Sequence, residues 1–213
     1  MSTYTIGIIG AGNMGAAFAK RLAAAGHRIA ITATDPSHAE QAARAAGAGA
    51  RAVPTADVAR GADLVILAVP YEAATEALRT AGDLAGTTVI DISNPGKPDF
   101  SGLAVGLTTS AAEDLQKAVP QVKVVKAFNT IFAAVLGGEA RSGAPPAQVF
   151  YAGDDAEAKG RVRALIESAG FEAVDAGPLA NARYLEPLGF LNIYLGYMAG
   201  RGMGIAPAWQ QVV

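Results

Sequence analysis

The residues with the clearest chemical meaning form a glycine-rich stretch near the N-terminus. It follows a short β-branched run, precedes an Ala-rich segment, and consists of Gly10, Ala11, Gly12, Asn13, Met14 and Gly15. This G-x-G-x-x-G spacing is typical of a dinucleotide-binding turn: Gly10 permits the tight turn, Gly12 lets a pyrophosphate approach the backbone, and Gly15 lets the helix pack on the strand. N–H groups at the helix start would face the phosphates. A plain tight turn is the alternative, and the position favours nicotinamide dinucleotide binding.

The choice between NADP and NAD depends on the residue that contacts the ribose 2′ position, about 20 positions further on. The candidates are Thr34 and Asp35, which follow the second β-branched run. Asp35 would accept from a 2′-hydroxyl and oppose a 2′-phosphate, whereas Thr34 would bind either ribose. Asp35 has an equally common role as a helix-start residue before Pro36. No Arg or Lys lies between Arg28 and Arg44, so NADP and NAD both stay open.

Three further strand ends are expected to face the nicotinamide, because ligands of open α/β sheets lie beyond the carboxyl ends of the strands. Val69 and Pro70 would form an apolar wall for the ring. Asn94 and Asn129 would offer amide groups to the carboxamide, the ribose or a substrate. Each has a structural alternative, since Asn-Pro initiates turns and Asn129 would cap a following helix.

Groups suited to general acid chemistry are scarce. A carbonyl reductase needs a proton donor for the developing alkoxide, and the only candidates are Lys126, Tyr71 and Tyr184, which are more often structural. Transfer of a hydride between two stacked rings requires mainly positioning. The sequence therefore predicts ring-to-ring transfer without a dedicated acid or base, with Asn129 and Lys126 as the remaining catalytic candidates.

Metal chemistry is not expected. The chain has no Cys, and no His, Asp and Glu residues have metal-ligand spacing. Its two histidines, His27 and His38, fall at the first and second connections between helix and strand, where a solvated surface position is expected.

The elements that must position these residues alternate between short apolar runs and Ala-rich helical segments. This alternation predicts an α/β fold of the Rossmann type, with a doubly wound, mostly parallel sheet and a small C-terminal βαβ unit followed by a helix. Ser37 with Glu40 and Ser110 with Glu113 have capping-box spacing at helix starts. The Gly/Pro-rich loop at 137–146 suggests a dinucleotide-binding domain over 1–140 and a small C-terminal part over 141–213. Expected strands lie at 5–9, 29–32, 64–69, 88–91, 122–127, 148–152 and 172–175, and expected helices at 13–25, 36–47, 72–81, 110–119, 157–169 and 180–197.

Composition excludes several classes of partner. Of the 213 residues, 17 are basic and 19 acidic, for a net charge of −2, whereas a nucleic-acid binder normally carries a basic excess. Hydrophobic residues make up 51%, which argues against disorder. The weakly polar stretch 187–200 is too short to span a membrane and is expected to form a buried helix or a subunit contact. With no signal-peptide pattern at the N-terminus, a cytoplasmic protein without membrane or nucleic-acid partners is expected.

Seven stretches together resemble the NADPH:coenzyme F-420 oxidoreductases, also called F420-dependent NADP reductases, and their bacterial relatives. They are also similar to the oxidoreductase domain of the STEAP-type metalloreductases. The stretch from Asp175 to Arg183 is the most specific of them. The matching stretches are 10–15, 68–70, 94–95, 109–113, 125–130, 153–155 and 175–183.

The resemblance implies a homodimer that passes hydride between a nicotinamide dinucleotide and a deazaflavin (coenzyme F-420) or flavin-like second substrate. It implies cofactor contacts from the glycine turn, Val69, Pro70 and Asn94, with Asn129, Thr130 and residues 177–179 beside the second substrate. This chain departs from the family in having Ala33-Thr34-Asp35 in place of a Ser-Arg pair for the 2′-phosphate, and Asn129 in place of the His of the archaeal enzymes. An imine or small-carbonyl reductase and a non-catalytic NAD(P) sensor are the alternatives.

Overall fold

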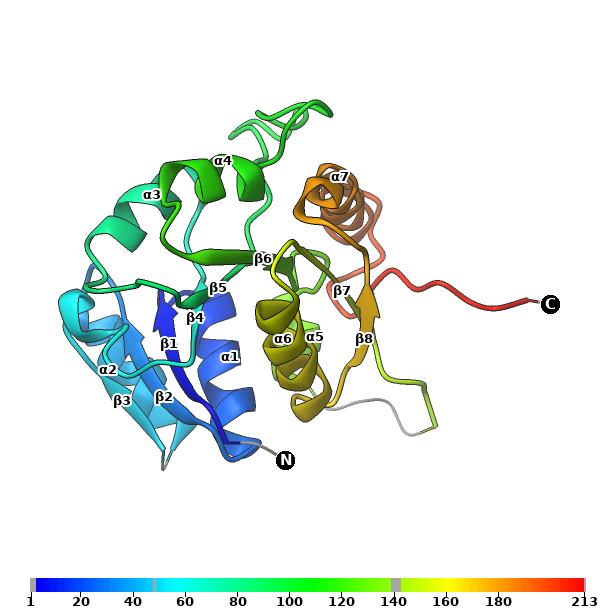
Figure 1. The fold of residues 1–213 in the computed structure, drawn as a ribbon. Coiled ribbons are helices and arrows are strands. Elements are labelled where there is room, and N and C mark those ends of the chain that lie inside the picture. The colour runs from blue at the N-terminus through cyan, green and yellow to red at the C-terminus, as the bar shows by residue number, and fades with distance from the viewer. Residues whose placement is uncertain (1–2, 48, 139–142, 213) are drawn as a thin grey trace.

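The computed structural model describes residues 3–47, 49–138 and 143–212, and they form one sheet covered by helices on both faces (Figure 1). The strand order is β3-β2-β1-β4-β5-β6-β7-β8. The strands are β1 (Thr5–Ile9), β2 (Arg28–Thr32), β3 (Ala50–Ala52), β4 (Leu64–Leu67), β5 (Thr88–Asp91), β6 (Lys123–Ala127), β7 (Gln148–Gly153) and β8 (Glu172–Asp175). The helices are α1 (Asn13–Ala24), α2 (Pro36–Ala46), α3 (Tyr71–Arg79), α4 (Ala111–Ala118), α5 (Ala133–Gly137), α6 (Ala156–Ser168) and α7 (Ala182–Ile193).

The sheet is mostly parallel, as predicted, and it changes direction once. Strands β1 to β6 are parallel neighbours, β7 pairs antiparallel with β6, and β8 pairs parallel with β7. The C-terminal βαβ unit therefore extends the same sheet. The predicted domain boundary between residues 140 and 141 lies outside the described residues.

Two apolar layers hold the helices on the sheet. One face packs against α1, α2, α5 and α6 around Phe18, Ile66 and Phe128. The other face packs against α3 and α4 around Leu67 and Leu115, and α7 continues this second layer beside β7 through Leu185. Because side chains alternate along each strand, buried runs such as β4 supply both layers at once.

Two short elements were not predicted. Strand β3 has three residues and α5 has five, too few to show a hydrophobic period in the sequence. The C-terminal helix was predicted over 180–197, and it consists of α7 followed by one π-helical turn, Tyr194–Met198. None of the helices in the described part of the chain has the length and apolarity needed to cross a membrane.

The helix caps confirm one expectation and correct another. Ser110 caps α4 by accepting a hydrogen bond from the Glu113 N–H, as its spacing predicted. The capping box of Ser37 with Glu40 is wrong, because Pro36 occupies the first turn of α2 and the cap is Asp35. The Asp35 carboxylate accepts from the Ser37 N–H at 2.9 Å.

His27 is buried, contrary to the expected surface position. It is 3% exposed and stacks on Tyr4. Its Nδ1 accepts from the Tyr4 N–H at 3.1 Å, so Nε2 carries the proton and donates to Ser168 Oγ at 2.9 Å. Burial lowers the pKa of His27, because a second ring proton would be desolvated and would face the Tyr4 N–H.

This histidine predicts a loss of stability in mild acid. Above pH ~6.5 the imidazole is neutral in both states and contributes nothing to pH dependence. Below that value the unfolded chain binds a proton that the folded chain resists, so the free energy of unfolding falls by at most ~1.4 kcal/mol per pH unit. Urea unfolding at pH 7.5 and 5.5 checks this. We expect His27→Phe, which keeps the stacking, to have a flatter pH profile than the parent. The exposed His38→Gln should keep the parent slope, and an unchanged slope in His27→Phe would contradict the assignment.

Candidate functional site

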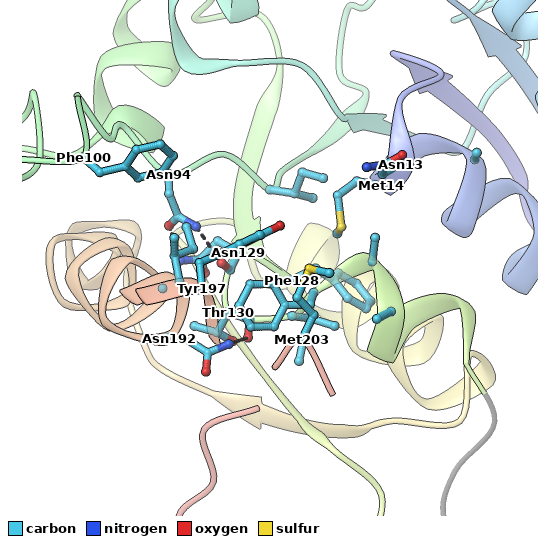
Figure 2. Close-up of a pocket in the computed structure, with 18 residues that line it drawn as sticks. Asn13, Met14, Asn94, Phe100, Phe128, Asn129, Thr130, Asn192, Tyr197 and Met203 are labelled. Atoms are coloured by element: carbon cyan, nitrogen blue, oxygen red, sulfur yellow. Dashed lines mark hydrogen bonds between the residues drawn. The ribbon is translucent and has the colours of Figure 1, made fainter. Parts of the chain in front are cut away.

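A large cavity lies between the start of α1 and the carboxyl ends of β5 and β6 (Figure 2). Its volume is about 750 Å³. Asn13 and Met14 contribute the wall on α1, and Asn94 and residues 128–130 contribute the strand ends. Helix α5, which packs beside α1, and the α7 segment with its π-helical turn complete the lining. The sheet thus gathers at one edge the segments that the sequence nominated separately.

The glycine turn has the geometry that a dinucleotide requires. Gly10 has φ +105°, and a Cβ there would lie 2.3 Å from the Ala68 carbonyl oxygen. A Cβ on Gly15 would lie 1.8 Å from the Gly10 oxygen, so the first turn of α1 packs directly on the loop. A Cβ on Gly12, by contrast, would meet no protein atom within 4 Å. Two of the glycines are therefore needed by the fold, whereas Gly12 leaves its backbone open to an incoming group.

The start of α1 also offers hydrogen-bond donors. Gly12 is the N-cap and provides no side-chain oxygen, whereas α2, α4 and α6 are capped by Asp35, Ser110 and Asp155. The first N–H groups of α1 and its helix dipole thus point into open space, as phosphate binding requires. Together with the uncrowded Gly12, these donors fit the pyrophosphate of a dinucleotide.

Asn94 and Asn129 are brought together at the strand ends. Asn129 Nδ2 donates to Asn94 Oδ1 at 2.9 Å and to the Leu185 carbonyl oxygen at 2.7 Å, and Asn94 Nδ2 donates to the Asn129 carbonyl oxygen at 2.7 Å (Figure 2). Gly189 of α7 lies directly over the pair, since a Cβ there would approach Asn94 Oδ1 to 2.6 Å. The two amides therefore fix α7 against the sheet as well as lining the cavity.

Two polar atoms in the cavity wall have no partner among the described residues. Asn129 Oδ1 and Thr130 Oγ1 are buried and make no hydrogen bond, while Asn192 on α7 binds only the Thr130 backbone oxygen, at 3.1 Å. Buried oxygens without a partner are costly.

Lys126 lies outside this cavity, on the opposite face of β6. It is fully buried, and its Nζ contacts Asp91 Oδ2 at 2.8 Å, Glu186 Oε1 at 2.9 Å and the Ser93 carbonyl oxygen at 2.6 Å. Glu186 in turn accepts from the Ala111 and Ala112 N–H groups at the start of α4. The three donors of the ammonium are all occupied, so none is left for a substrate.

The other nominated residues lie around the turn. Val69 and Pro70 do not line the large cavity; Val69 lies against Gly10, and Pro70 precedes α3. Thr34 lines a separate hollow at the end of β2, and Asp35 follows it. Hydrogen bonding from Ser37 lowers the pKa of the Asp35 carboxyl. The turn at 177–179, expected beside the second substrate, is not part of the cavity lining; it is tied to β7, where the Gly153 N–H donates to the Gly177 carbonyl oxygen.

Several cavity residues were not found from the sequence. Asn192 is a polar side chain within an apolar helical segment, and that contrast was a usable signal. The aromatic residues of the wall carried no such signal in the sequence. Phe132 meets Tyr197 edge to face, with ring centroids 5.7 Å apart, and Phe100 lies on a loop with a positive φ of 57°. These residues converge from loops and helices far apart in the chain, so no local pattern marks them.

Comparison with known proteins gives consistent results. Residues 5–95 match the family model "NADP oxidoreductase coenzyme F420-dependent". The rat metalloreductase STEAP3 is 31% identical over 186 residues, which is 86% of this chain and 36% of that protein. The chain thus spans about a third of the length of this curated relative.

Two solved structures are similar over most of both chains. A protein of Arthrobacter sp. FB24, provisionally assigned as an F420-dependent NADP reductase, is 32% identical with a TM-score of 0.79, over 95% of this chain and 97% of that one. The hypothetical protein SMa0349 of Sinorhizobium meliloti is 37% identical with a TM-score of 0.74, over 84% and 87%. A reductive aminase of Aspergillus terreus, 21% identical with a TM-score of 0.65 over 93% and 64%, shows the shared fold alone.

Proposed function

The chain belongs to the family of coenzyme F420-dependent NADP oxidoreductases, and on that basis we propose that it transfers a hydride between a nicotinamide dinucleotide and a deazaflavin or flavin-like acceptor. The observation that carries the proposal is the cavity of about 750 Å³ directly beside the open glycine turn. Its wall combines the apolar and aromatic side chains of Met14, Phe128, Phe132 and Tyr197. Such a wall suits flat rings.

The residues assigned to the cofactor are those around the turn. The backbone of residues 10–15 would hold the pyrophosphate, Thr34 and Asp35 lie toward the adenosine ribose, and Val69, Pro70, Asn94 and Asn129 lie toward the nicotinamide. When bound, the dihydronicotinamide supplies a hydride, and the acceptor ring takes it together with one proton from water. The protein's own contribution is to hold the two rings in contact in the orientation that hydride transfer needs.

The chemistry of the wall agrees with transfer that needs no acid or base. The cavity is lined by amides, the hydroxyls of Thr130 and Tyr197, and apolar groups, and the lining residues include no Lys, His, Asp or Glu among those the structure describes. A carbonyl reductase would need a proton donor there, and the Tyr197 phenol is the one such candidate among the described lining residues. The preference for ring-to-ring transfer over the imine or small-carbonyl reductase therefore rests on the family relation.

The test is an oxidation assay. Purified protein is mixed with NADH or NADPH and then with F420, FMN, ferric chelates or a cyclic imine, and the loss of reduced nicotinamide is followed at 340 nm. We expect turnover with F420 or FMN. Turnover on the imine alone would replace the proposal by the reductase alternative, and tight cofactor binding without turnover on any acceptor would favour the sensor.

We also propose that the protein is a homodimer that pairs through α7. Four large apolar or aromatic side chains recur along α7 and the π-helical turn that follows it, at intervals of seven, three and four residues that are close to a helical period. They are Tyr184, Leu191, Tyr194 and Met198, with exposed fractions of 69%, 51%, 55% and 69%. A contiguous exposed apolar face of this kind is typical of an interface.

A charge on this face is expected to separate the subunits. Leu191→Glu would place an unpaired carboxylate in an apolar contact, which costs several kcal/mol. We expect the parent protein to sediment as a dimer and Leu191→Glu as a monomer. Leu107→Glu, at a side chain that is 70% exposed on a different loop, is the matched control and should stay dimeric. A monodisperse parent monomer would refute the interface.

A further inference from the structure

A second hollow lies at the carboxyl ends of β2 and β3. Its volume is about 390 Å³, and residues 32–34 and 52–55 line it together with the start of α2. The Gly10 N–H donates to the Thr32 carbonyl oxygen at 2.8 Å, which places this hollow next to the glycine turn. In sheets of this topology the adenosine ribose lies at this strand end. The hollow is therefore the part of the site that meets the ribose 2′ group.

The charges around this hollow are negative. Glu40 is part of the lining, and Asp35 lies between two lining residues, Thr34 and Pro36. Neither Lys nor Arg occurs among the described residues that line it. Arg44 and Arg51, on the flanking elements α2 and β3, line a neighbouring crevice that shares Glu40 and Ala52 with this hollow, and neither arginine lines the hollow itself. A 2′-phosphate would thus meet two carboxylates and no cation from the lining.

The backbone at the start of α2 offers little compensation. The Ser37 N–H is bound to Asp35 Oδ1 at 2.9 Å, and the His38 N–H is bound to the Asp35 carbonyl oxygen at 3.1 Å. These are N–H groups through which a helix start would otherwise bind a phosphate. The carboxylate of the α2 cap, Asp35, is therefore a fixed negative charge at the position where an NADP site needs a positive one.

We infer that the dinucleotide site discriminates against a 2′-phosphate and binds NAD(H) in preference to NADP(H), and that Thr34 is the position that sets this preference. Thr34 is exposed at the rim of the hollow, and its neutral hydroxyl can bond a ribose hydroxyl but cannot neutralise a phosphate. The inference rests on the proposed dinucleotide site and departs from the NADP in the family's description. Its chemistry is local to the ribose, so it does not depend on the acceptor.

Binding titrations test the preference without any turnover. We expect NADH, followed by its fluorescence, to bind at least roughly tenfold more tightly than NADPH, because each unit charge pair at short range contributes about 1 kcal/mol even in water. Adenosine 5′-monophosphate should likewise displace NADH at lower concentration than adenosine 2′,5′-bisphosphate. This second comparison isolates the ribose hollow, since neither competitor carries a nicotinamide.

Two variants locate the cause. Thr34→Arg should tighten NADPH binding by roughly tenfold or more and weaken NADH binding, because the Thr34 hydroxyl no longer bonds the ribose; the gain in NADPH affinity should shrink as salt is raised. Thr34→Gln, long but neutral, is its control and should not favour NADPH.

Asp35→Ser keeps an oxygen for the α2 cap and removes the charge, so NADPH should bind more tightly. Its control is Asp83→Ser, an exposed aspartate that likewise accepts an N–H two residues on, from Ala85.

The outcomes separate this inference from the proposed function. NADPH binding as tight as NADH in the parent, or no gain of NADPH affinity in Thr34→Arg, would overturn the preference while leaving the oxidoreductase proposal intact. Selective NADH binding with no turnover on F420 or FMN would support the cofactor preference and overturn the oxidoreductase proposal. Failure of both cofactors to bind would overturn both.

Discussion

Gly12→Val is expected to abolish binding of either nicotinamide cofactor while the protein stays folded. The side chain would occupy the space through which a pyrophosphate reaches the backbone N–H groups of α1. Overpacking of this kind costs up to about 3 kcal/mol, or roughly a hundredfold in Kd. Fluorescence titration with NADH and NADPH measures the loss, and thermal unfolding checks the fold.

The structure explains why Gly12 is the informative position of the three. A Cβ on Gly10 or Gly15 would collide with backbone oxygens at 2.3 and 1.8 Å, so loss of binding there would be inseparable from loss of structure. Gly12 has no such neighbour and its φ of −71° is open to any residue. Gly160→Val, at an exposed glycine of α6 that is equally free of neighbours, is the control. Parent-like cofactor affinity in Gly12→Val would refute the phosphate turn.

Lys126→Met is expected to cost about 3–5 kcal/mol of folding free energy, the largest effect on stability that we predict. The ammonium bridges Asp91 and Glu186 at 2.8 and 2.9 Å, and all three side chains are at most 3% exposed. Its removal would leave two carboxylates in the interior without a cation. Urea unfolding, compared at constant m-value, measures the change.

A matched lysine on the same strand provides the control. Lys123 pairs with Asp155 at 3.2 Å, but its side chain is 50% exposed, so Lys123→Met should cost less than ~1 kcal/mol. Adding Glu186→Gln to Lys126→Met removes one stranded charge and should recover part of the loss. Equal costs for the two lysines, or no recovery in the double variant, would show that packing and not charge determines the effect.

The α/β fold and its glycine-rich turn could be predicted from the sequence because both are encoded locally. The β-branched runs and the Gly10–Gly15 spacing each occupy one short segment, and strand-to-helix alternation leaves few topologies for a parallel sheet. The sequence also nominated Asn94 and Asn129 at strand ends. It did not predict that these amides bind each other and α7, because the two residues are 35 positions apart.

The partners of the buried charged and polar groups could not be predicted from short stretches of sequence. Asp91 and Lys126 occupy paired positions on the neighbouring strands β5 and β6, and their contact could be inferred from the strand order. The third partner, Glu186, belongs to α7 and could not be inferred in this way. His27 is similar: its position after a helix indicates a surface turn, and it is buried because Tyr4 and Ser168 of distant segments close over it. Burial of a polar group depends on what packs on it, and that is a property of the assembled layers.

By itself, then, the sequence determined a Rossmann-type sheet, a glycine turn open to a dinucleotide, and the scarcity of acid–base groups, since each depends on residue type and short-range spacing. The tertiary structure alone decided that Lys126 is a buried counter-ion, that His27 is buried, and that the large cavity is walled by α5 and α7. The physical reason is that hydrogen-bond partners and desolvation are fixed by contacts between segments that only the fold brings together.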